Sequence, residues 1–362
     1  MEMRFARAED GVTIGYQVFG QGPVLVWLPS LSNIAAQWRI PAMRAAYEAL
    51  GRDMTVVLYD GRGMGASDRR IDLGDLGVDA HLRDLRAVLD HAGIRSASLL
   101  GYYHGAATAI AFAAREPERV ERLVLFGGAA RMREAMRPAQ TQALLSLVEQ
   151  DWGLFADAAA TAWLGWDSAA TGRWTAEAFR TATTAAVAKA WFSAAADIDV
   201  TAELGRVRAQ ALVLHRQGEQ QIPVEVFQRL ADGLPDGRLV ELPGSTPTLF
   251  LEDAARDIRL VTDFVLSGRL RSAVAPDAGH LRSAAAPDAG HLHSAAAPDT
   301  GRLTPREAEV LRLVADGDSN AEIARRLGIA VHTVERHLGN LYRKIGARGR
   351  ADAVAWAIRH SG

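Results

Sequence analysis

The chain has 362 residues, of which 49% are hydrophobic, 23% charged and none cysteine, so disulfides, thiol catalysis and cysteine-ligated zinc are excluded. No run approaches the roughly 20 apolar residues of a membrane span, and the N-terminus lacks a signal-peptide pattern, so we expect a cytoplasmic protein without membrane contact. Residues 1–268 hold 27 Lys and Arg against 33 Asp and Glu, whereas residues 303–362 hold 10 against 7, which favours a polyanionic partner only at the C-terminal end.

Strands alternate with helices along most of the first 268 residues. Alternating hydrophobicity predicts an antiparallel edge strand at 13–19. Apolar runs predict further strands at 24–28, 55–59, 97–100, 120–126, 211–215 and 238–242, and helical spacing predicts helices at 37–50, 78–93, 107–115 and 252–266. This order predicts a mostly parallel sheet covered on both faces, with functional loops at the carboxyl ends of the strands.

Two glycines mark a sharp turn between the strand at 97–100 and the helix at 107–115. Gly101 and Gly105 have the spacing of a nucleophile elbow, G-x-S-x-G, in which a serine is exposed on a strained turn. The centre of this elbow is Tyr103. The sequence therefore predicts the turn without its nucleophile.

An alanine-rich segment, residues 130–205, interrupts the alternation and predicts a helical lid inserted into the sheet domain. Its aromatic residues either pack the lid helices or line a pocket between lid and sheet. They include Trp152, Trp163, Trp166, Trp174 and Trp191.

Residues 269–302 contain three copies of an eleven-residue repeat, each with one proline and one glycine. Units this short cannot bury much apolar surface, so we interpret the segment as a low-complexity linker. Its histidines, His280, His291 and His293, could bind metal, but regular copying explains them better, and we expect no metal and no cofactor.

The last 60 residues predict a compact helical module. Thr304-Pro305-Arg306-Glu307 has the pattern of a capping box with proline at the first helical position, and Ser319 to Glu322 repeats the box. A third helix is predicted at 332–344 and a fourth at 350–359. Short helices joined by tight turns predict a helix-turn-helix at 303–362.

This module resembles the DNA-binding domain of LuxR-type regulators. The resemblance is carried by Leu303 to Leu311, Ser319 to Gly328, His332 to Leu338 and Leu341 to Gly346. It implies that the third helix enters the major groove of double-stranded DNA and that the fourth pairs subunits in a homodimer. By its side-chain chemistry, Arg336 can donate two hydrogen bonds to guanine, and Glu335 can accept one from the cytosine amino group. Many relatives carry lysine at position 335, so the operator sequence does not transfer. The expected DNA-binding residues are Thr333, Glu335, Arg336, His337, Asn340, Arg343 and Lys344.

Residues 10–268 resemble an α/β-hydrolase, on the strength of Tyr59 to Asp68, the elbow, Arg115 to Leu125 and Leu212 to His215. Nucleophile, acid and histidine follow one another along such chains. Here Tyr103 takes the first position and Glu219 the second, while Thr246 and Pro247 stand where relatives carry aspartate and histidine. The resemblance and these departures imply a hydrolase fold without a working triad. His104 remains as an alternative base.

The sequence therefore predicts an α/β-hydrolase fold with a helical lid over residues 1–268, a linker over 269–302 and an all-α LuxR-type module over 303–362. We expect a ligand-responsive transcription regulator that is not an enzyme and binds a small apolar or aromatic effector. A divergent esterase or lactonase tethered to DNA is the alternative, and a domain plugged by Tyr103 that binds nothing is a third interpretation. The expected ligand residues are Ser30, Leu31, Tyr103, His104, Trp163, Trp166, Trp191 and Thr246.

Overall fold

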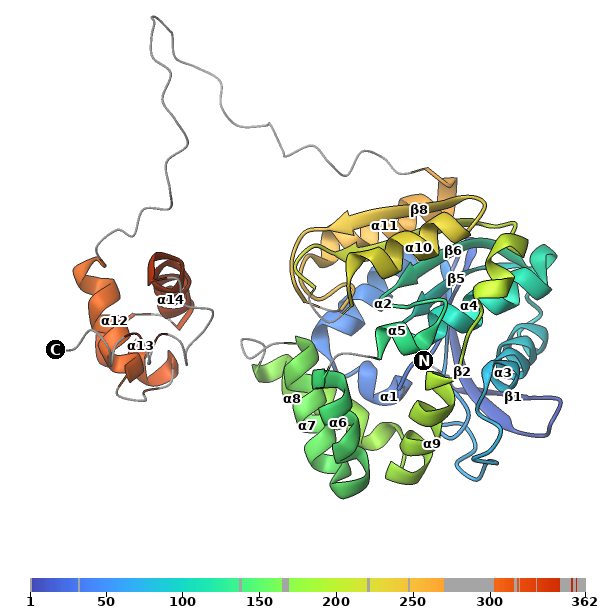
Figure 1. Ribbon diagram of the computed structural model, residues 1–362, viewed down its shortest axis with the longest axis horizontal. Helices are drawn as coiled ribbons and strands as arrows, with labels where there is room; N and C mark the ends of the chain where they lie inside the picture. Colours follow the sequence, from blue (N-terminus) through green and yellow to red (C-terminus); the bar gives the residue numbers. More distant parts are fainter. Residues whose placement is uncertain are drawn as a thin grey trace, which may run out of the picture. The chain divides into compact units, whose positions relative to one another are not determined.

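The structure, a computed structural model, divides the chain into two compact units, Met1–Ala278 and Gly279–Gly362, each of which is described by itself (Figure 1). It describes residues 2–31, 33–136, 139–164, 169–219, 222–246, 248–269, 303–315, 318, 320–329, 331–345, 353 and 356.

The first unit is built on an eight-stranded sheet of order β1-β2-β4-β3-β5-β6-β7-β8. The strands are β1 (Arg4–Arg7), β2 (Thr13–Gly20), β3 (Val24–Trp27), β4 (Thr55–Tyr59), β5 (Ala97–Tyr102), β6 (Val120–Phe126), β7 (Gln210–Arg216) and β8 (Gly237–Leu242). The β1–β2 and β2–β4 pairs are antiparallel, and every other pair is parallel. Because β4 and β5 lie on opposite sides of β3, the chain order reverses there, and a crevice forms at the carboxyl ends of β3 and β5.

Residues 13–19 form an antiparallel strand as predicted, but the prediction that this strand lies at the edge of the sheet is wrong. β1 covers β2, with Arg4 paired to Tyr16 and Arg7 to Thr13. Only Ala6 of β1 is buried, so four residues with a single buried side chain gave no alternating pattern to detect.

Helices cover both faces of the sheet. Those of the first unit are α1 (Ile34–Gln37), α2 (Pro41–Asp53), α3 (Val78–His91), α4 (His104–Arg115), α5 (Met132–Ala135), α6 (Ala139–Gln150), α7 (Trp152–Leu164), α8 (Ala169–Ala182), α9 (Ala185–Ala196), α10 (Val224–Gly233) and α11 (Ala254–Ser267), with 3₁₀ turns at Pro117–Arg119 and Thr201–Arg206. Alternate strand residues pack against α3, α4 and α10 on one face and against α2 and α11 on the other.

The helix expected at 37–50 is divided. Pro41 begins α2, and the residue before a proline is disfavoured in helical conformation, so Ile40 is extended, with φ −78° and ψ 112°. Residues after β3 therefore form the short helix α1, whose cap Asn33 accepts from the N–H of Ala36 at 3.1 Å. The break places α1 at the end of β3, beside the crevice.

Helices α6 to α9 form the lid expected over 130–205 and gather at one side of the sheet (Figure 1). The α8–α9 junction is tied to the glycine-rich loop after β4. The N–H of Gly65 donates to the carbonyl of Ala182 at 2.8 Å, and the hydroxyl of Thr183 donates to the carbonyl of Gly63 at 2.7 Å. That end of the lid is therefore fixed to the sheet domain.

The second unit contains α12 (Pro305–Ala315), α13 (Asn320–Leu327) and α14 (Val331–Ile345) around a core that includes Val310, Ile323, Val334 and Leu341. The fourth helix expected at 350–359 lies outside the described residues, apart from Ala353 and Trp356, which are helical. In the part of the chain that the structure describes, no helix combines the length and the apolar character needed to cross a bilayer.

Candidate ligand site and DNA-binding module

The turn between β5 and α4 has the backbone of a nucleophile elbow. Tyr103 stands at its centre with φ 49° and ψ −111°, a conformation that costs an L-residue on the order of 1–3 kcal/mol. Its N–H donates to the carbonyl of Phe126 at 2.9 Å. Glycine is needed at position 101 because a Cβ there would lie 2.6 Å from Cα of Ala106. The strand, turn and helix predicted around Tyr103 are confirmed.

The Tyr103 ring lies over the backbone of Gly127, where a Cβ would come within 2.9 Å of Cζ. Tyr102 and Phe126 meet the ring edge-to-face, at centroid distances of 5.0 and 6.4 Å. Burial raises the pKa of Tyr103 well above 10, and Tyr102 and the carboxylate of Glu219 raise it further. The phenol therefore keeps its proton at neutral pH.

A buried arginine organises the loop after β8. The Arg216 guanidinium is fully buried and pairs with the equally buried carboxylate of Asp257, with Nη2 and Oδ2 2.5 Å apart. It also donates to the carbonyls of Pro243 at 3.1 Å and Thr248 at 3.0 Å. Phe250, with φ 68°, donates its N–H to Asp257 at 3.1 Å. This cation and this anion together hold the segment in which the resemblance to α/β-hydrolases led us to expect a histidine.

Thr246 belongs to the same loop. Its N–H donates to Oε2 of Glu252 at 2.9 Å, and its carbonyl accepts from the N–H of Thr248 at 2.7 Å. Pro247 lies outside the described residues. The nearest histidine in the sequence, His215, is buried in β7 with its ring stacked at 4.5 Å on Phe227 of α10.

A cavity of about 20 Å³, here called the histidine cavity, lies beside the elbow. The His104 ring lies 4.1 Å from that of Trp191, and neither of its buried nitrogens has a hydrogen-bond partner in the described structure. Burial lowers the pKa of His104 to about 3 and that of His81 to about 4. The lining residues are Leu28, Pro29, Ser30, Tyr59, Gly61, Met64, His81, His104, Gly105, Thr108, Trp191, Ala195 and Ile198.

A second cavity, of about 120 Å³ and here called the aromatic cavity, lies at the carboxyl end of β3. It is lined by the sheet, by α1 and α2, by the lid residue Thr175 of α8 and by the loop after β8. The lining residues are Trp27, Leu28, Pro29, Ser30, Leu31, Ile34, Gln37, Ile40, Met43, Tyr47, Leu58, Tyr59, Tyr102, Thr175, Thr248, Leu249 and Leu251. Residues 28–30 line both cavities and lie between them.

The structure divides the predicted ligand residues between these cavities instead of bringing them together. Ser30 lines both, Leu31 lines only the aromatic cavity, and His104 and Trp191 line only the histidine cavity. Tyr103 and Thr246 are not among the described residues lining either one. Trp163 and Trp166 have side chains outside the described residues.

Sequence reasoning missed the rings that line the aromatic cavity. Trp27, Tyr47 and Tyr102 come from β3, α2 and β5, whereas the prediction looked for rings in the lid. Lid residues Trp152 and Phe155 stack on each other at 5.1 Å within the lid's own core. The available signal was position, because Trp27 and Tyr102 each end a strand that points at the crevice.

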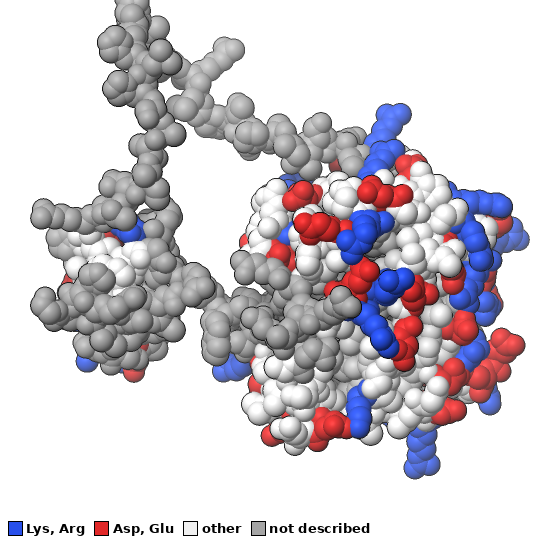
Figure 2. Space-filling model, in the orientation of Figure 1, with Lys and Arg blue, Asp and Glu red and all other residues white. Residues whose placement is uncertain are grey.

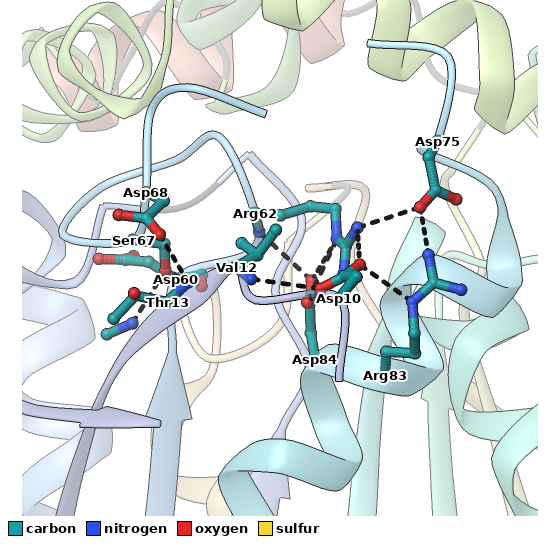
Figure 3. A network of polar contacts seen from close by, with 11 residues as sticks. Asp10, Val12, Thr13, Asp60, Arg62, Ser67, Asp68, Asp75, Arg83 and Asp84 are labelled. Carbon is teal, nitrogen blue, oxygen red and sulfur yellow. Dashed lines mark hydrogen bonds and ion pairs between the residues drawn. The ribbon is translucent and has the colours of Figure 1, made fainter. Parts of the chain in front are cut away.

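The glycine-rich loop after β4, Asp60 to Asp68, is held by a polar network (Figure 3). The nearly buried Arg62 pairs with the buried Asp84 of α3 at 2.8 Å and with Asp10 at 2.9 Å. Arg83 joins Asp10 at 3.0 Å and contacts Asp75. This network fixes the loop that is hydrogen-bonded to the α8–α9 junction. The same loop contributes Gly61 and Met64 to the lining of the histidine cavity.

In the second unit the capping box predicted at Thr304 to Glu307 is present, whereas Ser319 of the second predicted box lies outside the described residues. Oε2 of Glu307 accepts from the N–H of Thr304 at 2.8 Å, and the N–H of Glu307 donates to Oγ1 of Thr304 at 3.3 Å. Lys344, near the end of α14, pairs with the same Glu307 oxygen at 2.8 Å. That pairing, together with the hydrogen bonds from Thr304, lowers the pKa of Glu307 to about 2. Lys344 therefore links the end of α14 to the start of α12. Its expected contact with a DNA phosphate stays a prediction.

The predicted third helix is present as α14, and its inward residues Val334, Leu338 and Leu341 are buried. Thr333 and His337 are partly buried on α14. The side chains of Glu335, Arg336, Asn340 and Arg343 lie outside the described residues, so their contacts with DNA stay predictions. In the first unit, acidic and basic side chains are mixed over the face seen in Figure 2. That face offers no single-sign surface of the kind that binds nucleic acid.

Two family models match the chain. Residues 23–254 match the alpha/beta hydrolase fold, and residues 301–357 match the luxR family of bacterial regulatory proteins. The C-terminal part is similar to the CsgBAC operon transcriptional regulatory protein of Escherichia coli, with 51% identity over 55 residues. That alignment covers 15% of this chain and 26% of the E. coli protein, so the chain spans about a quarter of that relative.

The first unit is similar in structure to the enol-lactonase of Burkholderia xenovorans, with a TM-score of 0.61, 22% identity and coverage of 73% of this chain and 100% of that one. It is also similar to an esterase of Exiguobacterium antarcticum, with a TM-score of 0.65, 19% identity and coverage of 74% and 100%. The structural similarity supports the fold, but at identities this low it does not establish the chemistry, which has to be argued from the side chains.

Proposed function

The chain belongs to the α/β-hydrolase fold family, and from this premise we propose that it is a transcription regulator whose hydrolase-like unit binds a small effector and does not hydrolyse it. The LuxR-type unit binds double-stranded DNA, in the cytoplasm and as a homodimer. The observation that carries the proposal is Tyr103, a protonated phenol at the centre of an intact elbow.

Nucleophilic catalysis needs a base beside the nucleophile. The charged group whose effect reaches Tyr103 is the carboxylate of Glu219, and it makes the phenol harder to ionise. His104 is the remaining alternative. Its pKa is lowered to about 3, whereas a general base at neutral pH works best with a pKa near 7. The His104 imidazole is therefore too weak a base for this role.

The regulatory part of the proposal rests on the second unit. Its capping box, its packed α14 and its family match support a helix-turn-helix that reads the major groove. An effector changes DNA binding only through different affinities for two states of the protein, either two conformations or monomer and dimer.

Ester hydrolysis tests the first part of the proposal. The purified chain, Tyr103→Phe and His104→Ala should all hydrolyse p-nitrophenyl acetate and simple lactones no faster than the uncatalysed background, because neither side chain takes part in turnover. The measurement is initial rate against the uncatalysed background at pH 7–9. Turnover that disappears in either variant would instead establish the tethered hydrolase, which the preserved elbow geometry favours.

DNA binding tests the second part. Arg336→Ala should lower affinity by about 1–3 kcal/mol for the preferred operator and relax specificity at one base position. Arg343→Ala, a predicted phosphate contact, should weaken all sequences about equally. It is a better control than Lys344→Ala, because Lys344 is paired with Glu307. Fluorescence anisotropy on selected and scrambled duplexes at fixed salt distinguishes the two variants, and equal losses on every sequence would contradict the assigned reading face.

A further inference from the structure

We infer that the effector binds in the aromatic cavity and that it is a neutral molecule of single-ring size carrying one hydrogen-bonding group. The inference deepens the proposed function and rests on it. It also moves the expected binding site away from Tyr103 and His104, where a hydrolase would hold its substrate.

Volume separates the two cavities. The aromatic cavity holds about 120 Å³, close to the roughly 150 Å³ of an engineered protein cavity that binds benzene. The histidine cavity holds about 20 Å³, enough for about one water molecule. Of these two cavities, the aromatic cavity has room for a ring without rearrangement of the surrounding side chains, and the histidine cavity does not.

The walls of the aromatic cavity set the chemical class of its ligand. Trp27 lines it, with the ring of Tyr47 edge-to-face at 5.4 Å and that of Tyr102 at 6.2 Å from the Trp27 ring. The aliphatic side chains of Ile34, Ile40 and Leu249 complete the apolar surface. Among the described lining residues none carries a formal charge, so a charged ligand would lose its hydration without a counter-ion.

One buried polar atom at this cavity lacks a partner in the described structure, the hydroxyl oxygen Oγ1 of Thr248. The Thr248 backbone is held by Arg216, which donates to its carbonyl at 3.0 Å. The hydroxyl of Tyr47, which also lines the cavity, already has a partner, because it donates to Oε1 of Gln37 at 3.1 Å. A buried hydroxyl without a partner is destabilising, so a ligand that hydrogen-bonds Thr248 recovers that cost.

The cavity also connects the lid to the sheet. Thr175 of α8 lines it, and the same helix is anchored near its end by Asn33, whose amide donates to Oγ1 of Thr181 at 3.0 Å. A ligand in the cavity therefore contacts the lid, the sheet and the Arg216 loop together, so its affinity depends on how these parts are packed.

Phenol, toluene and benzoate are suitable probes for calorimetric titration of the full-length chain. Phenol should bind at one saturable site and more tightly than toluene, and benzoate should not bind. Thr248→Val should weaken phenol about two- to tenfold, to the level of toluene, and leave toluene unchanged. Because it removes an unpaired buried hydroxyl, the same variant should melt at the same temperature as the wild type or higher.

Cavity-filling variants locate the site. Met43→Trp and Thr175→Phe, at partly buried positions on α2 and α8, should each weaken phenol by at least about tenfold. Ala195→Val, which lines only the histidine cavity, is the matched control and should leave phenol binding unchanged. The inference is overturned if phenol does not bind, if Ala195→Val alone abolishes binding, or if benzoate binds as well as phenol.

Failure of the inference and failure of the proposed function give different results. Phenol binding together with ester turnover that depends on Tyr103 would support the cavity assignment. It would overturn the proposal that the hydrolase-like unit is not catalytic. Sequence-specific DNA binding by a protein that binds no ring probe would leave the regulator standing and overturn the cavity assignment.

Discussion

Asp257→Ala should lower the free energy of unfolding of the first unit by about 3–5 kcal/mol. The substitution removes the fully buried carboxylate that pairs with the fully buried Arg216 guanidinium, and leaves it only the longer contact to the 34% exposed Glu252, 3.8 Å from Nε. It also removes the acceptor for the N–H of Phe250, which is held at φ 68°. Urea unfolding followed by tryptophan fluorescence measures the effect, because seven of the eight tryptophans precede residue 279.

Two controls separate the buried pair from ion pairs in general. Glu118→Ala removes an exposed pair with Arg208, whose side chains are 87% and 73% exposed, and should change stability by less than about 1 kcal/mol. The double variant Arg216→Met with Asp257→Leu should recover much of the loss, since it leaves no unpaired charge in the core. A single variant as stable as the Glu118→Ala control would contradict the organising role of Arg216.

The first unit should lose about 2 kcal/mol of stability per histidine, from His81 and His104, when pH falls from 7 to 5. Burial lowers the pKa of His81 to about 4 and that of His104 to about 3, from an ordinary value of 6.5. Below pH 6.5 the unfolded chain therefore binds protons that the folded chain does not. This contribution is fully present above pH 6.5 and is lost progressively as pH falls toward 4 and 3.

Variants isolate this titration from that of the carboxyl groups. His104→Leu should flatten the fall in stability between pH 7 and 5 by about 2 kcal/mol relative to the wild type, because leucine does not titrate. Ile198→Val, at another residue that lines the same cavity, should shift stability equally at all pH values. Parallel pH profiles for the wild type and His104→Leu would mean that His104 titrates normally in the folded chain.

The fold follows from the sequence where the signal is local. Apolar runs predicted six of the eight strands, alternating hydrophobicity predicted β2, and Thr304 with Glu307 predicted the start of α12. β1 was missed because only Ala6 is buried there, and the break before α2 was missed although Pro41 disfavours a helical residue before it.

The candidate site was less predictable, because its contacts join distant residues. Arg216 and Asp257 are 41 positions apart, and neither belongs to a motif that announces a buried pair. The glycines of the elbow indicated Tyr103 correctly as its centre. They could not indicate that the larger cavity opens beside Trp27 and Tyr102, because cavity volume depends on side chains from five separate segments of the chain.

The preserved backbone at Tyr103 has a consequence for evolutionary reversibility. The turn still bends as a catalytic turn does, with φ 49° and ψ −111°, so a return to a nucleophile there needs a change of side chain and no change of backbone. The loop after β8 is different, because Arg216, Thr248 and Asp257 now depend on one another. A substitution that introduced a histidine into this loop would therefore have to keep these contacts, and the loop tolerates less change than the elbow does.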